Sequence, residues 1–425
     1  MDDTAERHLG ARVARTARLG GFAVVVGVLA GLSSAAFLVA LEWVTEERLD
    51  HPSLLYLLPL AGLGVGLVYH YGGGRSVEGS NLILDEIHEP TDWVPRRMAP
   101  MIFVGTCLTQ LFGGSAGREG AAIQMSGSLT DLSARTLRLR PEDRRVLLVA
   151  SISGAFGAMF GVPFAGAVFG LEVQRTRRRH LPAVLPCLVA SIVGDRVVRA
   201  LGVHHEATPA LHVALTFTTA AKVVLAAVAF GLAGTVFSVL THSIKHLFER
   251  ALRWAPARPL VGGVLVIVVT LLLGTRAYNG LSIGLVESSL FGGDVATWAF
   301  GAKLLLTALT LGAGFVGGEV TPLFVVGATL GATLGTALHV PTPLLAALGF
   351  VAVFAGAANA PVSCIVLGME LFGVSAAPYL ALACLVSFAA SSHRGLYTGD
   401  VGRSALVPWA VVAARRRRPP VAEIP

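Results

Sequence analysis

Long apolar stretches follow one another along nearly the whole chain, and short polar segments separate them. A run of this length and composition is typical of a helix that crosses a bilayer. At least ten such runs are present, and they predict an all-α polytopic membrane protein. They cover residues 22–41, 54–68, 146–171, 183–198, 220–240, 260–273, 303–316, 323–338, 344–367 and 376–390.

The composition agrees with a surface that faces lipid. Of the 425 residues, 54% are hydrophobic and 14% are charged, whereas a soluble domain carries about 25% charged residues. Residues 1–10 are polar, and the first apolar run has no small-residue cleavage site, so no signal peptide is expected. We therefore expect the protein to stay in the membrane.

Arginines cluster at residues 7–18, 135–145, 175–179 and 415–418. By the positive-inside rule these loops and both termini are expected on the cytoplasmic side of the cell inner membrane. Each cluster adjoins an apolar run without an aromatic and basic binding surface, so no nucleic-acid partner is expected.

The sequence does not favour a metal or cofactor site, and it does not favour enzymatic hydrolysis. The four cysteines lie in apolar runs without metal-ligand spacing, so neither a metal nor a cofactor is expected. Residues 113–117 (Gly-Gly-Ser-Ala-Gly) match the pattern of a nucleophile elbow, but that elbow requires a strand before it. The preceding run is long and apolar. An enzyme is therefore not expected, and a membrane-embedded hydrolase acting through Ser115 is a remote alternative.

Two parts of the chain share the same motifs about 200 residues apart. Residues 117–119 (Gly-Arg-Glu) and 317–319 (Gly-Gly-Glu) are each followed by a glycine eight residues after the glutamate. Residues 163–172 and 361–370 share a Pro-x6-Gly-x-Glu spacing, and the offsets are 200 and 198 residues. This order indicates a duplicated half.

The repeat predicts how the chain is organised. We expect a basic cytoplasmic segment, a first membrane half, a linker, a second membrane half and a basic tail, at residues 1–19, 20–201, 202–209, 210–405 and 406–425. Duplicated halves with Gly- or Pro-interrupted segments mark a binding site near the midplane. Helix starts carry free N–H groups that attract anions, and glycine lets the backbone approach the ion. The pattern predicts an anion transporter.

Glu119 lies in a Gly-rich segment between apolar runs. An intramembrane carboxylate is costly and usually functional. It is expected to compete with the anion for helix-start N–H groups and to leave them when protonated. The alternatives are an ion pair with Arg118 or a position in a cytoplasmic loop.

Glu319, Thr321 and Pro322 form the counterpart in the second half, where a proline fits the first turn of a helix. The alternative for Glu319 is a capping acid. Glu172 and Glu370 each end an apolar run, and Glu172 is interpreted as a structural residue at a cytoplasmic helix end.

Three further side chains are candidates for the anion site. Ser80 and Asn81 offer a hydroxyl and an amide at a helix start, although N-capping explains them equally well. Tyr397 follows the last apolar run, where a tyrosine is also typical of an interfacial anchor.

These motifs resemble those of the CLC family of chloride channels and transporters over about residues 20–405. Residues 79–83 are similar to its Gly-Ser-Gly-Ile-Pro block, residues 117–121 to its Gly-Arg/Lys-Glu-Gly-Pro block, and residues 318–322 to its Gly-x-Phe-x-Pro block. The resemblance implies an inverted repeat of about eighteen helices, several of them short or broken, and a homodimer with one anion pathway per subunit. The cystathionine-synthase-like (CBS) domains that follow the membrane part in many relatives are not expected here, because the chain ends soon after Arg418.

The resemblance assigns roles to single residues. It makes Glu119 the gating and proton-coupled glutamate, and it places Ser80, Asn81, Thr321 and Tyr397 at the bound anion. The backbone that faces the anion at the helix starts is then that of Gly79, Gly117, Arg118, Gly120, Gly317, Gly318 and Val320.

Departures from the chloride pattern resemble the fluoride/proton antiporter branch. They are Ala121 in place of proline, the Gly-Gly-Glu-Val-Thr-Pro-Leu-Phe run at 317–324, and Val173 where many antiporters carry a proton-relay glutamate. Ser80 is instead a chloride-type residue. The resemblance implies fluoride export in exchange for protons, with Glu319 in the coupling. A chloride/proton antiporter and a passive anion channel are the alternatives.

Overall fold

The chain folds almost entirely into helices. The computed structural model describes residues 3–174, 181–211 and 213–391, and these contain sixteen α-helices, four short 3-10 helices and no strand. The predicted all-α fold is confirmed. The resemblance implies about eighteen helices, and residues 392–425 lie outside the described part.

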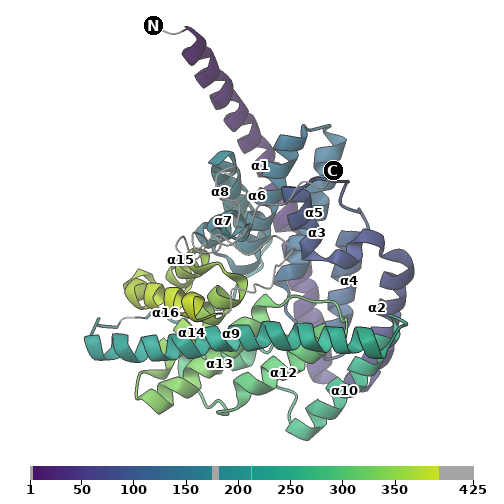
Figure 1. Ribbon diagram of the computed structural model, residues 1–425, viewed down its shortest axis with the longest axis vertical. Coiled ribbons are helices and arrows are strands. Elements are labelled where there is room, and N and C mark those ends of the chain that lie inside the picture. The colour runs from purple at the N-terminus through teal and green to yellow at the C-terminus, as the bar shows by residue number, and fades with distance from the viewer. Residues whose placement is uncertain (1–2, 175–180, 212, 392–425) are drawn as a thin grey trace, which may run out of the picture.

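Eight helices precede the linker, and eight follow it (Figure 1). The first eight are α1 (Asp3–Asp50), α2 (Leu58–Gly72), α3 (Ser80–His88), α4 (Met98–Leu111), α5 (Glu119–Thr136), α6 (Pro141–Phe160), α7 (Pro163–Glu172) and α8 (Val184–Ala200). The others are α9 (Phe217–Ala251), α10 (Ala257–Leu273), α11 (Ile283–Phe291), α12 (Ala299–Gly312), α13 (Val320–Leu338), α14 (Thr342–Ala358), α15 (Pro361–Phe372) and α16 (Ala377–Ala390).

Few of these helices are both long and apolar enough to span a bilayer. Within the described residues, four helical spans are long and apolar enough: Arg15–Asp50, Pro52–Gly72, Phe217–Ala251 and Val320–Leu338. Apart from α5 and α6, the other helices have 9 to 17 residues, so many helix ends lie inside the body of the protein. Those ends present backbone N–H and C=O groups that need partners.

Two of the predicted apolar runs, 146–171 and 344–367, are each broken into two helices. Helix α6 ends at Phe160 and α14 at Ala358, and the residues that follow, Gly161 and Asn359, have a left-handed backbone at φ +70° and +54°. Pro163 and Pro361 then open α7 and α15, because proline has no N–H to continue the preceding helix. Each of these two apolar runs therefore forms a pair of helices, and the break is the same in both.

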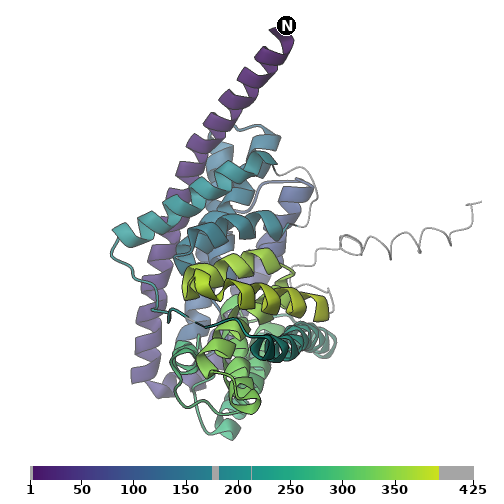
Figure 2. The same cartoon turned by 90° about the vertical axis from the view of Figure 1, so that its left-hand side faces the viewer.

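The core forms where the two sets of helices meet. Residues 344–358 of α14 are buried throughout. Aromatic rings join the two sets of helices, since Phe156 of α6 stacks on Phe354 of α14 with ring centroids 6.4 Å apart. In the view of Figure 2, most of α1–α8 (purple to teal) lies above α10–α14 (green). This packing holds the helix ends of both sets against one another.

Candidate functional site

The two Gly-Glu motifs meet at one point in the middle of the molecule. The amide of Gly117 donates to the carbonyl of Gly318 at 2.7 Å, and the amide of Gly318 donates to the carbonyl of Gly117 at 2.8 Å. Helix α5 begins at Glu119 and α13 at Val320, directly after this bridge. Two helix starts 200 residues apart therefore converge.

Glycine is required at this crossing because the backbones touch. A Cβ on Gly318 would lie 2.9 Å from the amide nitrogen of Gly120 and 3.2 Å from that of Glu119. One on Gly317 would lie 2.4 Å from the Cβ of Ala116. Val320 fills the first turn of α13 and is fully buried.

The carboxylate of Glu119 lies on the start of α13. The side chain is 1% exposed. Its Oε2 accepts from the amide of Thr321 at 3.0 Å and from that of Arg118 at 3.2 Å. Its Oε1 accepts from the hydroxyl of Thr321. A helix start with free N–H groups attracts negative charge, and here a side-chain carboxylate supplies it.

Arg118 is shared by two acids. Its Nη2 donates to both carboxylate oxygens of Glu206 at 3.1 and 3.2 Å. Its Nε lies 3.6 Å from Oε1 of Glu119 and makes no hydrogen bond. The alternative in which Glu119 pairs with Arg118 is present as an ion pair without a side-chain hydrogen bond, while Glu206 is the hydrogen-bonded partner of Arg118. No local pattern in the sequence marks Glu206, which lies 88 residues from Arg118.

Ser80 lies beside the start of α5 and does not contact Glu119 directly. Gly79 has φ +63° and turns the chain into α3, where Ser80 is the first residue. The Ser80 hydroxyl lies 3.5 Å from the carbonyl of Gly120 and accepts from Nε2 of Gln124 at 3.3 Å. Asn81 is partly buried, and the structure gives its side chain no hydrogen bond to a described residue. Gln124 was missed by the sequence analysis.

Of the two remaining candidates, Glu319 lies among the described residues and Tyr397 does not. Glu319 precedes α13 and is partly buried, but its side chain makes no capping hydrogen bond. Glu319 thus occupies the N-cap position of the capping-acid alternative, but without the capping hydrogen bond. Among the described residues its carboxylate has no hydrogen bond or ion pair. Tyr397 lies outside the described residues.

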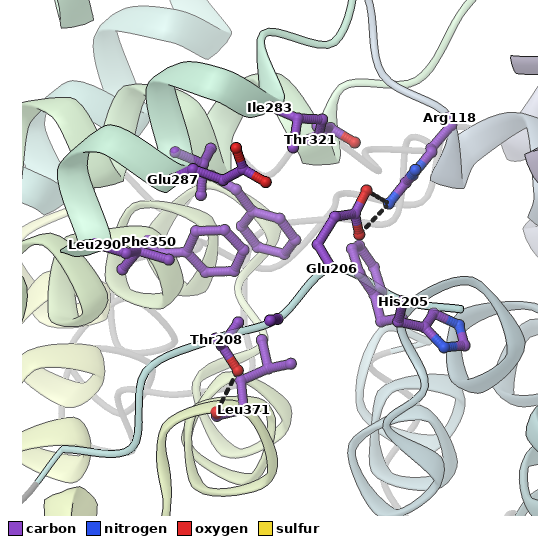
Figure 3. Close-up of a pocket in the computed structure, with 14 residues that line it drawn as sticks. Arg118, His205, Glu206, Thr208, Ile283, Glu287, Leu290, Thr321, Phe350 and Leu371 are labelled. Atoms are coloured by element: carbon purple, nitrogen blue, oxygen red, sulfur yellow. Dashed lines mark hydrogen bonds and ion pairs between the residues drawn. The ribbon is translucent and has the colours of Figure 1, made fainter. Parts of the chain in front are cut away.

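A vestibule has Thr321 in its lining (Figure 3). We use this name for a cavity of about 60 Å³ whose walls are mostly apolar, with the charged side chains of Arg118, Glu206 and Glu287 also lining it. In Figure 3, Glu206 points at Arg118, and Glu287 extends from α11 into the same space. The apolar walls include Phe160, Val286, Leu290, Phe324 and Phe350.

A smaller inner cavity lies on the Ser80 side. It measures about 10 Å³ and is lined by Ser80 and by apolar side chains, including Val173. A buried water needs two to four polar partners, and Ser80 is the one polar side chain in this lining. Glu119 thus lies between a charged vestibule near Thr321 and a nearly apolar cavity near Ser80.

The geometry around Ser115 does not match a hydrolase. Its hydroxyl lies 2.8 Å from that of Thr307, and its amide donates to the hydroxyl of Thr310. The segment follows helix α4 and not a strand. In the described ranges no three His, Cys, Asp or Glu side chains are grouped as they would be around a metal ion.

Comparisons with known proteins agree on one family. The model of the voltage gated chloride channel family matches residues 61–392. The chain is 46% identical over 393 residues to a chloride/fluoride channel protein of Pseudomonas syringae pv. tomato, covering 89% of this chain and 86% of that protein. It is 28% identical over 389 residues to the H(+)/Cl(-) exchange transporter ClcA of Yersinia pestis, covering 82% and 79%. The crystal structure of a CLC-type fluoride/proton antiporter superimposes with a TM-score of 0.87 at 31% identity, covering 90% of this chain and 97% of that one.

Proposed function

Because this chain belongs to the voltage-gated chloride channel (CLC) family, we propose that it is a fluoride/proton antiporter that exports fluoride from the cytoplasm in exchange for protons. Two similar proteins support fluoride as the anion. The 46% identical relative is named for both chloride and fluoride, and the 31% identical structure is that of a fluoride/proton antiporter.

The observation that carries the proposal is the carboxylate of Glu119 on the start of α13. This carboxylate accepts hydrogen bonds from the amide and the hydroxyl of Thr321, which are the kind of donors that a small anion needs. When Glu119 is protonated it loses its charge, and it then binds these donors more weakly. The donors are then free for fluoride, and the neutral side chain carries a proton away from the site. Each turn of this cycle moves one anion and one proton in opposite directions.

Fluoride places strict demands on such a site. The ion is small and strongly hydrated, so the protein has to replace its water with close, well-aimed donors. Thr321 offers two donors, its amide and its hydroxyl, which bind the two oxygens of one carboxylate. In this proposal Ser80, Asn81 and Tyr397 complete the anion pathway, and Glu319 takes part in proton coupling as a second acid one residue before α13.

The orientation follows from the arginines. Arg15 and Arg18 pair with Asp143 at the start of α6, and Arg144 pairs with Asp131 near the end of α5. This arginine-rich end is cytoplasmic by the positive-inside rule. Residues 202–209 follow the opposite end of α8, so the vestibule opens away from the cytoplasm. We propose an inner-membrane location with both termini cytoplasmic.

The decisive experiment measures proton uptake by the purified protein in liposomes. A fluoride gradient is applied to one set of liposomes and a chloride gradient to another. We expect proton movement with fluoride and far less with chloride. Equal coupling with chloride would make the protein a chloride/proton antiporter of the same family. Anion flux without proton movement would make it a passive channel.

A further inference from the structure

Arg118 lines the vestibule and forms ion pairs with two acids, Glu119 and Glu206. The residue is 7% exposed, so its guanidinium has few contacts with solvent. Glu206 engages Nη2 with both oxygens, whereas Nε faces Glu119 at 3.6 Å without a hydrogen bond. Figure 3 shows the pair meeting at one side of the vestibule. A small rotation of the guanidinium separates this state from one in which Arg118 binds Glu119 directly.

The two acids compete for the same cation. A buried guanidinium requires an acceptor, and a bidentate carboxylate is the strongest one available to it. While Glu206 is in place, Arg118 has a bidentate partner, and its Nε faces Glu119 without a hydrogen bond. If Glu206 lost its charge, Glu119 would be the one acid left within 4 Å of Arg118 among the described residues.

We propose that Glu206 is a positioning residue of the transport cycle, which holds Arg118 so that the guanidinium does not fix Glu119 in the anion site. The proposal rests on the function proposed above, because it takes the departure of Glu119 as a step of the cycle. Glu206 itself touches neither the anion donors nor Glu119. It acts through the one side chain that stands between them.

The other charged groups nearby do not replace Glu206. His205 contacts the carbonyl of Ala158 through Nε2 at 2.9 Å, and burial lowers the pKa of its ring, so it is neutral at neutral pH. Arg199 and Asp195 lie beyond His205 and pair with each other. Glu287 lines the vestibule without an ion pair to Arg118.

Glu206 is ionised under the conditions in which it would act. Partial burial raises the pKa of its carboxyl, but the charge of Arg118 and the hydrogen bonds lower it by more. The net pKa lies below the ordinary value for a glutamate. The carboxylate therefore holds Arg118 throughout the neutral range.

The test compares Glu206→Gln with the wild type in liposomes and records fluoride flux against pH on the vestibule side. With Glu206 neutral, the full charge of Arg118 favours the ionised form of Glu119, so a higher proton concentration is needed to release it. We expect slower flux at neutral pH and a half-maximal rate at a pH lower by about one unit. Glu206→Asp, which keeps the charge, is expected to retain most of the wild-type profile.

Two controls separate this role from a general effect. Glu287→Gln removes the same charge from the same vestibule without touching Arg118, and we expect an unshifted profile. In a Glu119→Gln background, Glu206→Gln should cause no further change, because the group that Arg118 would capture is absent. An unshifted profile in Glu206→Gln, an equal shift in Glu287→Gln, or an equal loss of flux in the double variant would each overturn the proposal. If the wild type moved fluoride without moving protons, the proposed antiport would be refuted. The comparison of the pH profiles of wild type and Glu206→Gln would still test the role of Glu206, because it measures fluoride flux alone.

Discussion

At the scale of single residues, the carboxylate of Glu119 makes the contacts that a bound anion would make. Its two oxygens accept hydrogen bonds from the amide and the hydroxyl of Thr321, and the side chain is almost fully buried. A buried carboxylate of this kind is stable only while such donors face it. Its position and its charge state are therefore linked, which is the property that an exchanger needs.

This link predicts the effect of Glu119→Gln. The amide keeps an oxygen that can accept from Thr321, so the fold should be retained, but the side chain no longer takes up a proton. We expect fluoride-driven proton uptake in liposomes to fall to the background of empty vesicles, while fluoride still passes. Proton pumping at the wild-type rate would remove Glu119 from the mechanism.

Glu319 is a second acid at the same crossing. It is partly buried and has no hydrogen bond or ion pair to a described residue, which is a costly state for a carboxylate with only a structural role. Glu319→Gln should lower coupled fluoride/proton exchange by about a hundredfold, the smaller end of what loss of a proton-transfer group costs. The matched control is Glu249→Gln, which loses an exposed pair with His246. Wild-type exchange in Glu319→Gln would assign the coupling to other groups.

At the scale of helices, sequence patterns predicted some breaks and missed others. The paired motifs predicted a binding site near the midplane that both halves share, and the bridge between Gly117 and Gly318 shows that the starts of α5 and α13 meet. Helix α5 was not among the predicted apolar runs because it carries Gln124, Ser126 and Asp131. These polar side chains are buried against protein and do not face lipid, so hydropathy does not report them.

Helices α7 and α15 cap one another. Glu172, at the end of α7, accepts from the amides of Val362 and Ser363 at the start of α15 at 3.0 and 2.7 Å. Glu370, near the end of α15, accepts from the amides of Phe164 and Ala165 at the start of α7 at 3.1 and 2.6 Å. The interpretation of Glu172 as a structural helix-end residue agrees with these contacts. The shared Pro-x6-Gly-x-Glu spacing has this exchange of caps as its physical reason.

The reciprocal caps predict a loss of stability in Glu370→Gln. The amide has one acceptor oxygen in place of two and carries no charge, so the start of α7 loses a charge-assisted hydrogen bond. We expect a destabilisation of about 1 to 2 kcal/mol, seen as a lower midpoint of thermal unfolding in detergent. Glu89→Gln, after the end of α3, is the control and should leave the midpoint unchanged. An unchanged midpoint in Glu370→Gln would show that the cap contributes nothing measurable.

At the scale of the whole molecule, the sequence predicted the class of fold, and the two motifs assigned to the anion site meet in the structure. It did not predict what surrounds these motifs. The pairing of Arg118 with Glu206 joins residues 88 positions apart, and no periodicity or motif marks it. Residues 202–209 read only as a polar junction, although Glu206 lines the vestibule. Contacts of this kind depend on how the helices pack, which local patterns do not encode.

The same packing leaves one face of the molecule unsuited to lipid. Helices α7 and α15 have 10 and 12 residues, so each is about 15 to 18 Å long, whereas the hydrocarbon core is about 30 Å thick. Beside their exposed Phe164 and Val362 lie the partly buried carboxylates of Glu172 and Glu370. Lipid offers no partner for polar groups at such helix ends. A second copy of the chain would cover both the apolar side chains and these caps.

We therefore predict a homodimer that associates through α7 and α15, with a complete site in each subunit. Phe164 is 57% exposed on α7, and Leu272 is 81% exposed on α10, at a distant part of the molecule (Figure 1). In membranes treated with a short thiol-specific cross-linker, Phe164→Cys should yield covalent dimers and Leu272→Cys should not. Both variants should keep fluoride flux before cross-linking, because neither residue lines the two cavities. Equal cross-linking at both positions would indicate random collision, and a fully active protein that remains monomeric in dilute liposomes would show that one subunit suffices.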